Sequence, residues 1–301
     1  MTVATARNPQ DDLFPTMPRP PADVEHTEGI FTAWDGTDLF WQSWEPREGE
    51  LRGVIALMHG FGEHSARYHH ISSAFARRGY AVCAIDARGH GRSSGARAYV
   101  DAFDCYARDY DLLMTEIEKR WPDEICFAFG HSTGGLIALH HALVYPGRVA
   151  AYAVTSPFVG WKFKVPAIKA VAARLLSKVL PKLPMASDFD ATLVSHDPAV
   201  VAKYTSDPLN LSVATPRWFT EINKGHALVL ERASEIKAPF LFFVSDTDEV
   251  VDPRAAEIVY HALGSADREL QLLRGLKHEV LNEEGWEALI DQIVEWYERF
   301  R

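Results

Sequence analysis

The stretch Ile125-Cys-Phe-Ala-Phe-Gly-His-Ser-Thr-Gly-Gly135 decides the fold class. An apolar run, typical of a buried strand, ends in glycine, and a helical pattern begins at Ser132. Gly130 and Gly134 lie two residues away on either side of the serine. A tight strand-to-helix turn of this kind exposes a nucleophilic hydroxyl, and side chains at the two glycine positions would collide with neighbouring backbone. The spacing Gly-x-Ser-x-Gly is a weak signal by itself, so its meaning depends on the rest of the chain.

Strand and helix patterns alternate on both sides of this turn. A hairpin is expected first, with strands at 29–34 and 38–44 around Asp35-Gly36. Apolar strands are then expected at 53–58, 81–85, 125–129, 149–155, 240–244 and 269–273, and helices at 68–78, 103–120, 132–145, 255–263 and 286–300. Continuous apolar strands that alternate with helices predict an α/β fold with a mostly parallel sheet covered on both faces.

The pattern divides the chain into three parts. Residues 1–22 contain five prolines and are expected to form an extended leader. Residues 23–156 and 223–301 carry the alternation and are expected to form the core. Between 157 and 222 the alternation breaks, which predicts an insertion lying over the sheet as a cap.

Charge and hydropathy exclude several classes of function. Lys and Arg number 31 against 41 Asp and Glu, a net charge of -10, which argues against nucleic acid as a partner because phosphate binding needs a basic face. No secretory signal is recognised, and no apolar run approaches the ~18 residues of a membrane span. A cytoplasmic protein is expected.

The three cysteines show no Cys-x-x-Cys spacing and are expected to be buried, reduced thiols.

A serine nucleophile needs a base, and the base needs an acid that orients it. On this type of sheet the acid and then the histidine follow the serine along the chain. Asp246, Asp248 and Asp252 lie just past one predicted strand, and His278 lies past the next. His261 falls inside a helical pattern. His278 is therefore the expected base, and the aspartate cluster supplies the acid.

Two backbone N–H groups must face the oxyanion that forms during acyl transfer. One belongs to Thr133, directly after the serine. The other is expected from Phe61 in the loop His59-Gly-Phe-Gly-Glu-His64, whose two glycines let the backbone approach closely. The alternative interpretation of this loop is a simple strand-to-helix turn.

Five ordered motifs together resemble the monoacylglycerol lipase and lysophospholipase-like branch of the α/β-hydrolase fold, which is similar to the S33 serine aminopeptidases. They are His59-Gly-Phe-Gly-Glu-His64 with Arg67-Tyr68, Asp86-Ala-Arg-Gly-His-Gly-Arg-Ser93, Gly130-His-Ser-Thr-Gly-Gly135, Asp248-Glu-Val-Val-Asp252 and Lys277-His-Glu279. The resemblance runs from about residue 29 to the C-terminus. It implies an α/β-hydrolase core with an inserted helical cap, and a catalytic triad of Ser132, Asp248 and His278.

The resemblance also implies roles near the substrate. It places Phe61 and Thr133 in the oxyanion hole, and Glu63 and Arg67 in a wall near the polar head of the substrate. An ion pair that only fixes the loop is the alternative for Glu63 and Arg67. Some animal members carry a second histidine three residues past the base, where this chain has Leu281, so the resemblance does not extend to that glycerol contact.

The activity implied is two-step hydrolysis of a medium- or long-chain acyl monoester, such as a monoacylglycerol, without a metal or organic cofactor. A lysophospholipase, a serine aminopeptidase and a thioesterase are alternatives on the same scaffold, and a catalytically silent binding protein is an alternative of a different class.

Two other motifs are weak evidence for a nucleotide or metal site. Gly89-His-Gly-Arg-Ser-Ser-Gly95 is one residue too long for a dinucleotide fingerprint, and the histidines at 59, 64, 69 and 70 lack metal-ligand spacing.

The cap reverses the charge of the rest of the chain. Residues 161–187 carry six basic residues and no acidic one. Ile168, Val171, Leu175 and Val179 recur at helical spacing. Either this apolar stripe packs on the core while the basic residues face water, or the cap makes a peripheral contact with an anionic lipid surface. In both cases an apolar cap favours a lipid-like ester over a sugar or phosphate. The oligomeric state is not predicted.

Overall fold

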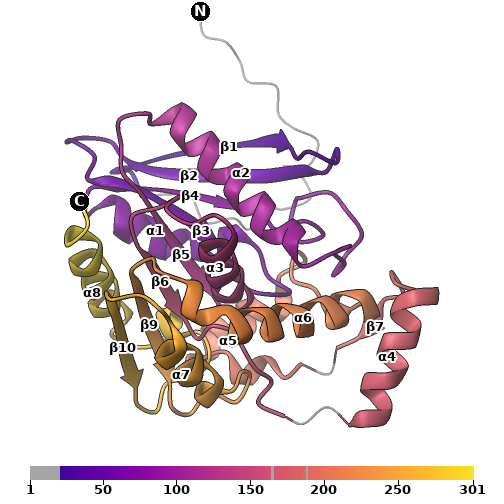
Figure 1. Cartoon of the computed structure of the whole chain (residues 1–301). Helices are drawn as coiled ribbons and strands as arrows, with labels where there is room; N and C mark the ends of the chain where they lie inside the picture. The colour runs from indigo at the N-terminus through magenta and orange to yellow at the C-terminus, as the bar shows by residue number, and fades with distance from the viewer. Residues whose placement is uncertain (1–20, 164–165, 188) are drawn as a thin grey trace, which may run out of the picture.

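A computed structural model describes residues 21–163, 166–187 and 189–301 of the chain. An eight-stranded sheet with the order β1-β2-β4-β3-β5-β6-β9-β10 lies at its centre (Figure 1). β1 pairs antiparallel with β2, β2 pairs antiparallel with β4, and the other neighbours are parallel. The strands are β1 Val24–Thr32, β2 Asp38–Pro46, β3 Gly53–Met58, β4 Tyr80–Ile85, β5 Cys126–His131, β6 Tyr152–Thr155, β9 Phe240–Ser245 and β10 Arg268–Leu273. The predicted α/β class is confirmed.

Helices cover both faces of this sheet (Figure 1). They are α1 His69–Ala76, α2 Asp104–Arg120, α3 Thr133–Val144, α6 Pro216–Arg232, α7 Pro253–Ala262 and α8 Trp286–Glu298. Side chains of α1 and α8 belong to one apolar cluster, and those of α2, α3, α6 and α7 belong to the other. β3 shows how one strand serves both clusters: Val54, Ala56 and Met58 point to one, and Ile55 and Leu57 to the other. Such two-sided burial explains why the central strands are apolar throughout.

The first strand differs from its prediction. It begins at Val24 rather than near residue 29 because its whole length pairs with β2, from Val24 opposite Pro46 to Thr32 opposite Asp38. The added residues from Glu25 to Glu28 are polar and partly or fully exposed, as suits an edge strand, so no apolar pattern marks them. Of the leader predicted at 1–22, residues 1–20 lie outside the described part of the chain.

Residues 157–222 contain elements that do not join the central sheet. These are α4 Ala167–Val179, α5 Pro198–Ser206 and a separate antiparallel pair, β7 Met185–Ala186 with β8 Val213–Ala214. Figure 1 shows α4 at the margin of the molecule, farther from the sheet than α6. The predicted end of the insertion at 222 falls inside α6, which continues to Arg232.

The three cysteines are free thiols; Cys83 is buried, whereas Cys105 and Cys126 are only partly so. Within the described ranges, no helix has both the length and the apolar character that crossing a bilayer requires.

Candidate active site

Ser132 occupies a strained turn between β5 and α3. Its φ of 53° and ψ of -117° are a conformation that non-glycine residues rarely adopt. A Cβ added at Gly130 would come within 2.4 Å of the Gly134 carbonyl oxygen, and one added at Gly134 within 2.1 Å of the Met58 carbonyl oxygen. The expected collisions are confirmed, and they explain why both positions are glycine.

Asp248 and His278 meet across two loops that follow neighbouring strands, β9 and β10. His278 Nδ1 lies 2.8 Å from Asp248 Oδ2. The other carboxylate oxygen accepts hydrogen bonds from the N–H groups of Val250 at 2.8 Å and Val251 at 3.0 Å. Of the three aspartates in this segment, Asp248 is therefore the one that contacts the histidine and is itself held in place.

The environment of this pair sets its protonation. Burial lowers the pKa of His278, but the attraction of Asp248 and their hydrogen bond outweigh burial and leave the pKa above its usual value. Burial raises the pKa of Asp248, whereas His278 and the two backbone donors lower it below its usual value overall. An anionic Asp248 therefore favours a protonated imidazole, which is what a general base becomes once it has taken a proton.

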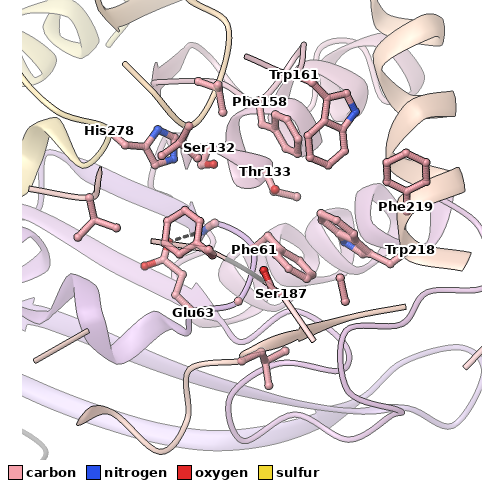
Figure 2. Close-up of a pocket in the computed structure, with 18 of the residues that line it drawn as sticks. Phe61, Glu63, Ser132, Thr133, Phe158, Trp161, Ser187, Trp218, Phe219 and His278 are labelled. Atoms are coloured by element: carbon pink, nitrogen blue, oxygen red, sulfur yellow. Dashed lines mark hydrogen bonds between the residues drawn. The ribbon is translucent and has the colours of Figure 1, made fainter. Parts of the chain in front are cut away.

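His278 and Ser132 line the same cavity, and Figure 2 shows the imidazole beside the serine at one end of it. The His278 carbonyl accepts a hydrogen bond from the Ser156 hydroxyl at 2.8 Å, which fixes the loop. The ring of His131 lies 4.8 Å from that of His278. Burial, followed by repulsion from His278, lowers the pKa of His131 to about 4, so this neighbour is neutral.

Phe61 and Thr133, the expected oxyanion donors, both line the cavity, and Figure 2 shows them on the side of the serine away from His278. Thr133 begins α3, so its N–H has no acceptor within the helix. The ring of Phe61 stacks on Trp218 of α6, with centroids 3.6 Å apart, and its edge contacts His90. This packing holds the loop after β3 against the sheet.

Glu63 and Arg67 form a buried network behind that loop. Glu63 Oε1 accepts hydrogen bonds from the Gly60 N–H and the Tyr68 hydroxyl, both at 2.6 Å. Arg67 pairs with Glu63 and, at 2.7 and 2.8 Å, with both carboxylate oxygens of Glu279. Glu63 and Glu279 line the cavity, whereas Arg67 does not. The ion pair of the alternative interpretation is thus present, and Arg67 reaches the cavity only through the two carboxylates.

The rest of the cavity is apolar. Its volume is about 480 Å³, and Figure 2 shows aromatic rings gathered away from His278. The larger aromatic and aliphatic side chains that line it include Phe158, Trp161, Phe163, Met185, Phe189, Val194, Tyr204, Leu211, Trp218, Phe219, Val250 and Val251. Most of them lie between residues 157 and 222, so this part of the chain supplies most of the apolar wall.

The cap helix contradicts one interpretation of its sequence. Its apolar stripe does not pack on the core: the exposed fractions of Ile168, Leu175 and Val179 are 81%, 61% and 71%, and Val171 is also exposed. Lys164 lies outside the described residues, and nothing is described of the Lys169 side chain. The periodicity correctly predicted a helix, but its contact with α6 is made by the buried Ser177, whose hydroxyl bonds to Thr220 and Arg217.

The clustered histidines have protein partners rather than a shared centre. These contacts join His59 to Gly60 O and Ala87 N, His64 to Asp207, His69 to Trp44, and His70 to Leu281 O. Across the part of the chain that the structure describes, no three His, Cys, Asp or Glu side chains converge as metal ligands would.

Comparisons with known proteins agree with this fold. A family profile described as serine aminopeptidase, S33, matches residues 49–285. The monoacylglycerol lipase of Mycolicibacterium smegmatis is 31% identical over 272 residues, which cover 90% of this chain and 96% of that protein. The monoglyceride lipase of Homo sapiens is 32% identical over 252 residues, or 83% and 82% of the two chains. The crystal structure of Paleococcus ferrophilus monoacylglycerol lipase matches with a TM-score of 0.78 and 26% identity, covering 92% of this chain and 100% of that one.

The fold and these matches define a serine hydrolase of the α/β-hydrolase class, as the five motifs predicted. The chain belongs to the family described as serine aminopeptidase, S33. Sequence reasoning assigned no role to two residues that the structure places at the site, Glu279 and Trp218. Glu279 belongs to the motif Lys277-His-Glu279, which could have pointed to it. No local signal pointed to Trp218, which contacts Phe61 only through the tertiary fold.

Proposed function

We propose that the protein is a carboxylester hydrolase that cleaves medium- and long-chain acyl monoesters such as monoacylglycerols. One observation carries the proposal: a serine on a strained turn and a histidine bonded to a buried aspartate at 2.8 Å share one cavity with apolar walls. The names of the similar lipases support the substrate class. The lipid-like ester would place its acyl chain among the aromatic rings and its carbonyl at Ser132.

The proposed reaction has two steps. Ser132 Oγ attacks the ester carbonyl while His278 Nε2 takes the hydroxyl proton, and Asp248 stabilises the imidazolium that forms. The N–H groups of Phe61 and Thr133 receive the oxyanion, each contributing about 3 kcal/mol to the stability of the transition state. His278 then protonates the leaving alcohol. Water repeats the sequence, releases the fatty acid and restores the serine.

A peptidase is the second candidate, because Glu63 and Glu279 bring two carboxylates to the cavity where an aminopeptidase would hold a substrate ammonium. The geometry disfavours it. Arg67 pairs with both carboxylates, and Glu63 also accepts hydrogen bonds from the Gly60 N–H and the Tyr68 hydroxyl, so these carboxylate oxygens already have partners within the protein. Lysophospholipase and thioesterase activities remain alternatives that share the same triad.

The substrate proposal is tested by fatty-acid release from a 1-monoacylglycerol series of increasing chain length. Lysophosphatidylcholine, an acyl thioester and an aminoacyl arylamide are assayed in parallel with purified protein. Release from monoacylglycerols is expected. The acyl chain length that is cleaved fastest should reflect the length of the apolar cavity. Cleavage of the arylamide without release from any monoacylglycerol would contradict the proposal and favour the peptidase.

We also propose that α4 makes a peripheral contact with anionic lipid surfaces. The helix presents Ile168, Leu175 and Val179 to solvent. Exposed basic residues lie on this helix and near it in the sequence; those whose side chains the structure describes are Arg174 and Lys178 on α4, Lys162 before it and Lys182 after it. Apolar side chains that insert at an interface while basic residues meet anionic head groups are the usual composition of such a surface. Substrate could then enter the cavity from the lipid without crossing water.

Exchanging the exposed apolar residues is expected to weaken this contact. The double variant Ile168→Ser with Leu175→Ser should partition at least about a hundredfold less into phosphatidylglycerol vesicles, because each buried aliphatic side chain contributes about 1.5 kcal/mol or more. Vesicle co-sedimentation measures the change. Ile30→Ser is the matched control, since Ile30 is 60% exposed but lies on β1. Equal partitioning of both variants and the unmodified protein would contradict the contact.

A further inference from the structure

One guanidinium connects the two loops that carry the oxyanion donor and the base. Arg67 and Glu279 are 212 positions apart in the sequence, yet they form a two-point ion pair at 2.7 and 2.8 Å. The same guanidinium pairs with Glu63, whose carboxylate accepts the Gly60 N–H beside Phe61. Glu279 directly follows His278 in the chain. A continuous series of polar contacts therefore runs from the Phe61 loop to the His278 loop.

This series is enclosed by protein. The exposed fractions of the Arg67, Glu63 and Glu279 side chains are only 7%, 5% and 6%. Tyr204 of α5 covers the guanidinium, with its ring centroid 4.6 Å away. Glu279 is fixed further by its N–H, which donates to the Val194 carbonyl at 2.8 Å. Charged hydrogen bonds in such a site are little screened by water and hold their groups in one geometry.

We propose that Arg67 and Glu279 are positioning residues, which hold the oxyanion loop and the base loop at a fixed separation around Ser132. The proposal rests on the proposed function only in that Ser132 is the nucleophile; it does not depend on which ester is cleaved. Neither residue takes part in the chemistry. Their effect is exerted through Gly60 and Phe61 on one side and through His278 on the other.

The physical reason is the pairing of charges. Two carboxylates share one guanidinium, so each loop is attracted to the same buried cation. Loss of the Glu279 charge releases the base loop from this cation, and loss of Arg67 leaves two carboxylates facing each other. Because catalysis depends on sub-ångström placement of reacting groups, small shifts of either loop are costly in rate.

The test compares Glu279→Gln with Glu283→Gln. Glu283 is a buried carboxylate of the same loop that accepts hydrogen bonds from the N–H groups of His196 and Lys277 and does not contact Arg67. The amide oxygen of Gln can still accept both of these bonds, so this exchange removes a charge without releasing the loop. The readouts are kcat, KM and the rate of Ser132 labelling by a fluorophosphonate probe. For Glu279→Gln we expect kcat and the labelling rate to fall by between about tenfold and a hundredfold, with KM little changed. For Glu283→Gln we expect no such fall.

The pH profile separates positioning from general loss of structure. The Glu279 carboxylate contributes to the raised pKa of His278, after Asp248. Removing that negative charge destabilises the imidazolium, so the acid limb of the labelling rate should move to lower pH in Glu279→Gln. In a variant that is only less stable, the fraction of protein that the probe labels would fall, but the pH at which the labelling rate falls on the acid side would not change.

Arg67→Gln provides a second route. It should lose more activity than Glu279→Gln, and the double variant should recover part of the loss because the facing carboxylates are then reduced to one. If Arg67→Gln does not fold, the labelling rate and the pH profile of Glu279→Gln still test the positioning proposal. An unmodified protein that the probe does not label contradicts the proposed function. If the Glu279→Gln variant is labelled at the same rate and with the same pH dependence as the unmodified protein, the positioning proposal is wrong, while the proposed function still stands.

Discussion

Fatty-acid release by the Ser132→Ala variant is expected to fall by about 10⁴- to 10⁶-fold in kcat. The variant lacks the hydroxyl that forms the acyl-enzyme, so only oxyanion stabilisation and substrate binding remain to accelerate attack by water. The strained turn at φ 53° and the two flanking glycines remain, so the fold should be retained. Steady-state kinetics on a monoacylglycerol and labelling by a fluorophosphonate probe measure the effect.

Ser73→Ala is the matched control for this prediction. Ser73 is also buried, but it lies in α1, donates to the His69 carbonyl and does not line the cavity. We expect its kcat to stay close to that of the unmodified protein. If Ser132→Ala retained more than a small fraction of the activity, the nucleophile would have to be a different residue.

The Asp248→Asn variant is expected to lose about 10⁴-fold in kcat. The amide oxygen of Asn would keep the bonds from the Val250 and Val251 N–H groups, so its NH₂ group would face His278 Nδ1 in place of the acceptor now at 2.8 Å. The imidazole would then adopt the tautomer that cannot take the serine proton. The unmodified protein should show an acid limb above the usual histidine pKa, since Asp248 and its hydrogen bond outweigh burial at His278. Activity rises with pH through that limb because the base must be neutral, and the limb should move to lower pH in the variant.

The neighbouring aspartates serve as controls for Asp248. Asp246 accepts a hydrogen bond from the Gly275 N–H, and Asp252 caps the N-terminus of α7. The exchanges Asp246→Asn and Asp252→Asn should change kcat only slightly. A large loss in either one, with activity retained in Asp248→Asn, would show that the acid had been assigned to the wrong residue. The pH dependence of kcat/KM for all three variants is the deciding measurement.

Much of the fold was predictable because its signals are local. Apolar runs such as Gly53–Met58 and Phe240–Ser245 became central strands, and the helices that were expected lie within a few residues of their bounds. The helix α6 was not predicted. The glycines around Ser132 are required by contacts that the turn itself creates. Among the strands, β1 differed most from its prediction, because an edge strand with polar residues takes its structure from the partner β2 rather than from its own pattern.

For the site, the order of motifs was sufficient to select Ser132 and His278, whereas the choice of Asp248 among three aspartates depended on resemblance. The tertiary structure places Asp248 against the histidine because parallel strands bring the loops after β9 and β10 to the same edge of the sheet.

The sequence by itself determined the class of fold, the strained serine turn and the apolar, basic character of the cap. Only the tertiary structure decided which way the stripe of α4 faces, since helical spacing shows that Ile168 and Leu175 share a face but not what covers it. Only the tertiary structure joined Arg67 to Glu279 and stacked Trp218 on Phe61. Contacts between residues more than a hundred positions apart depend on how the strands order themselves, and no local pattern encodes that order.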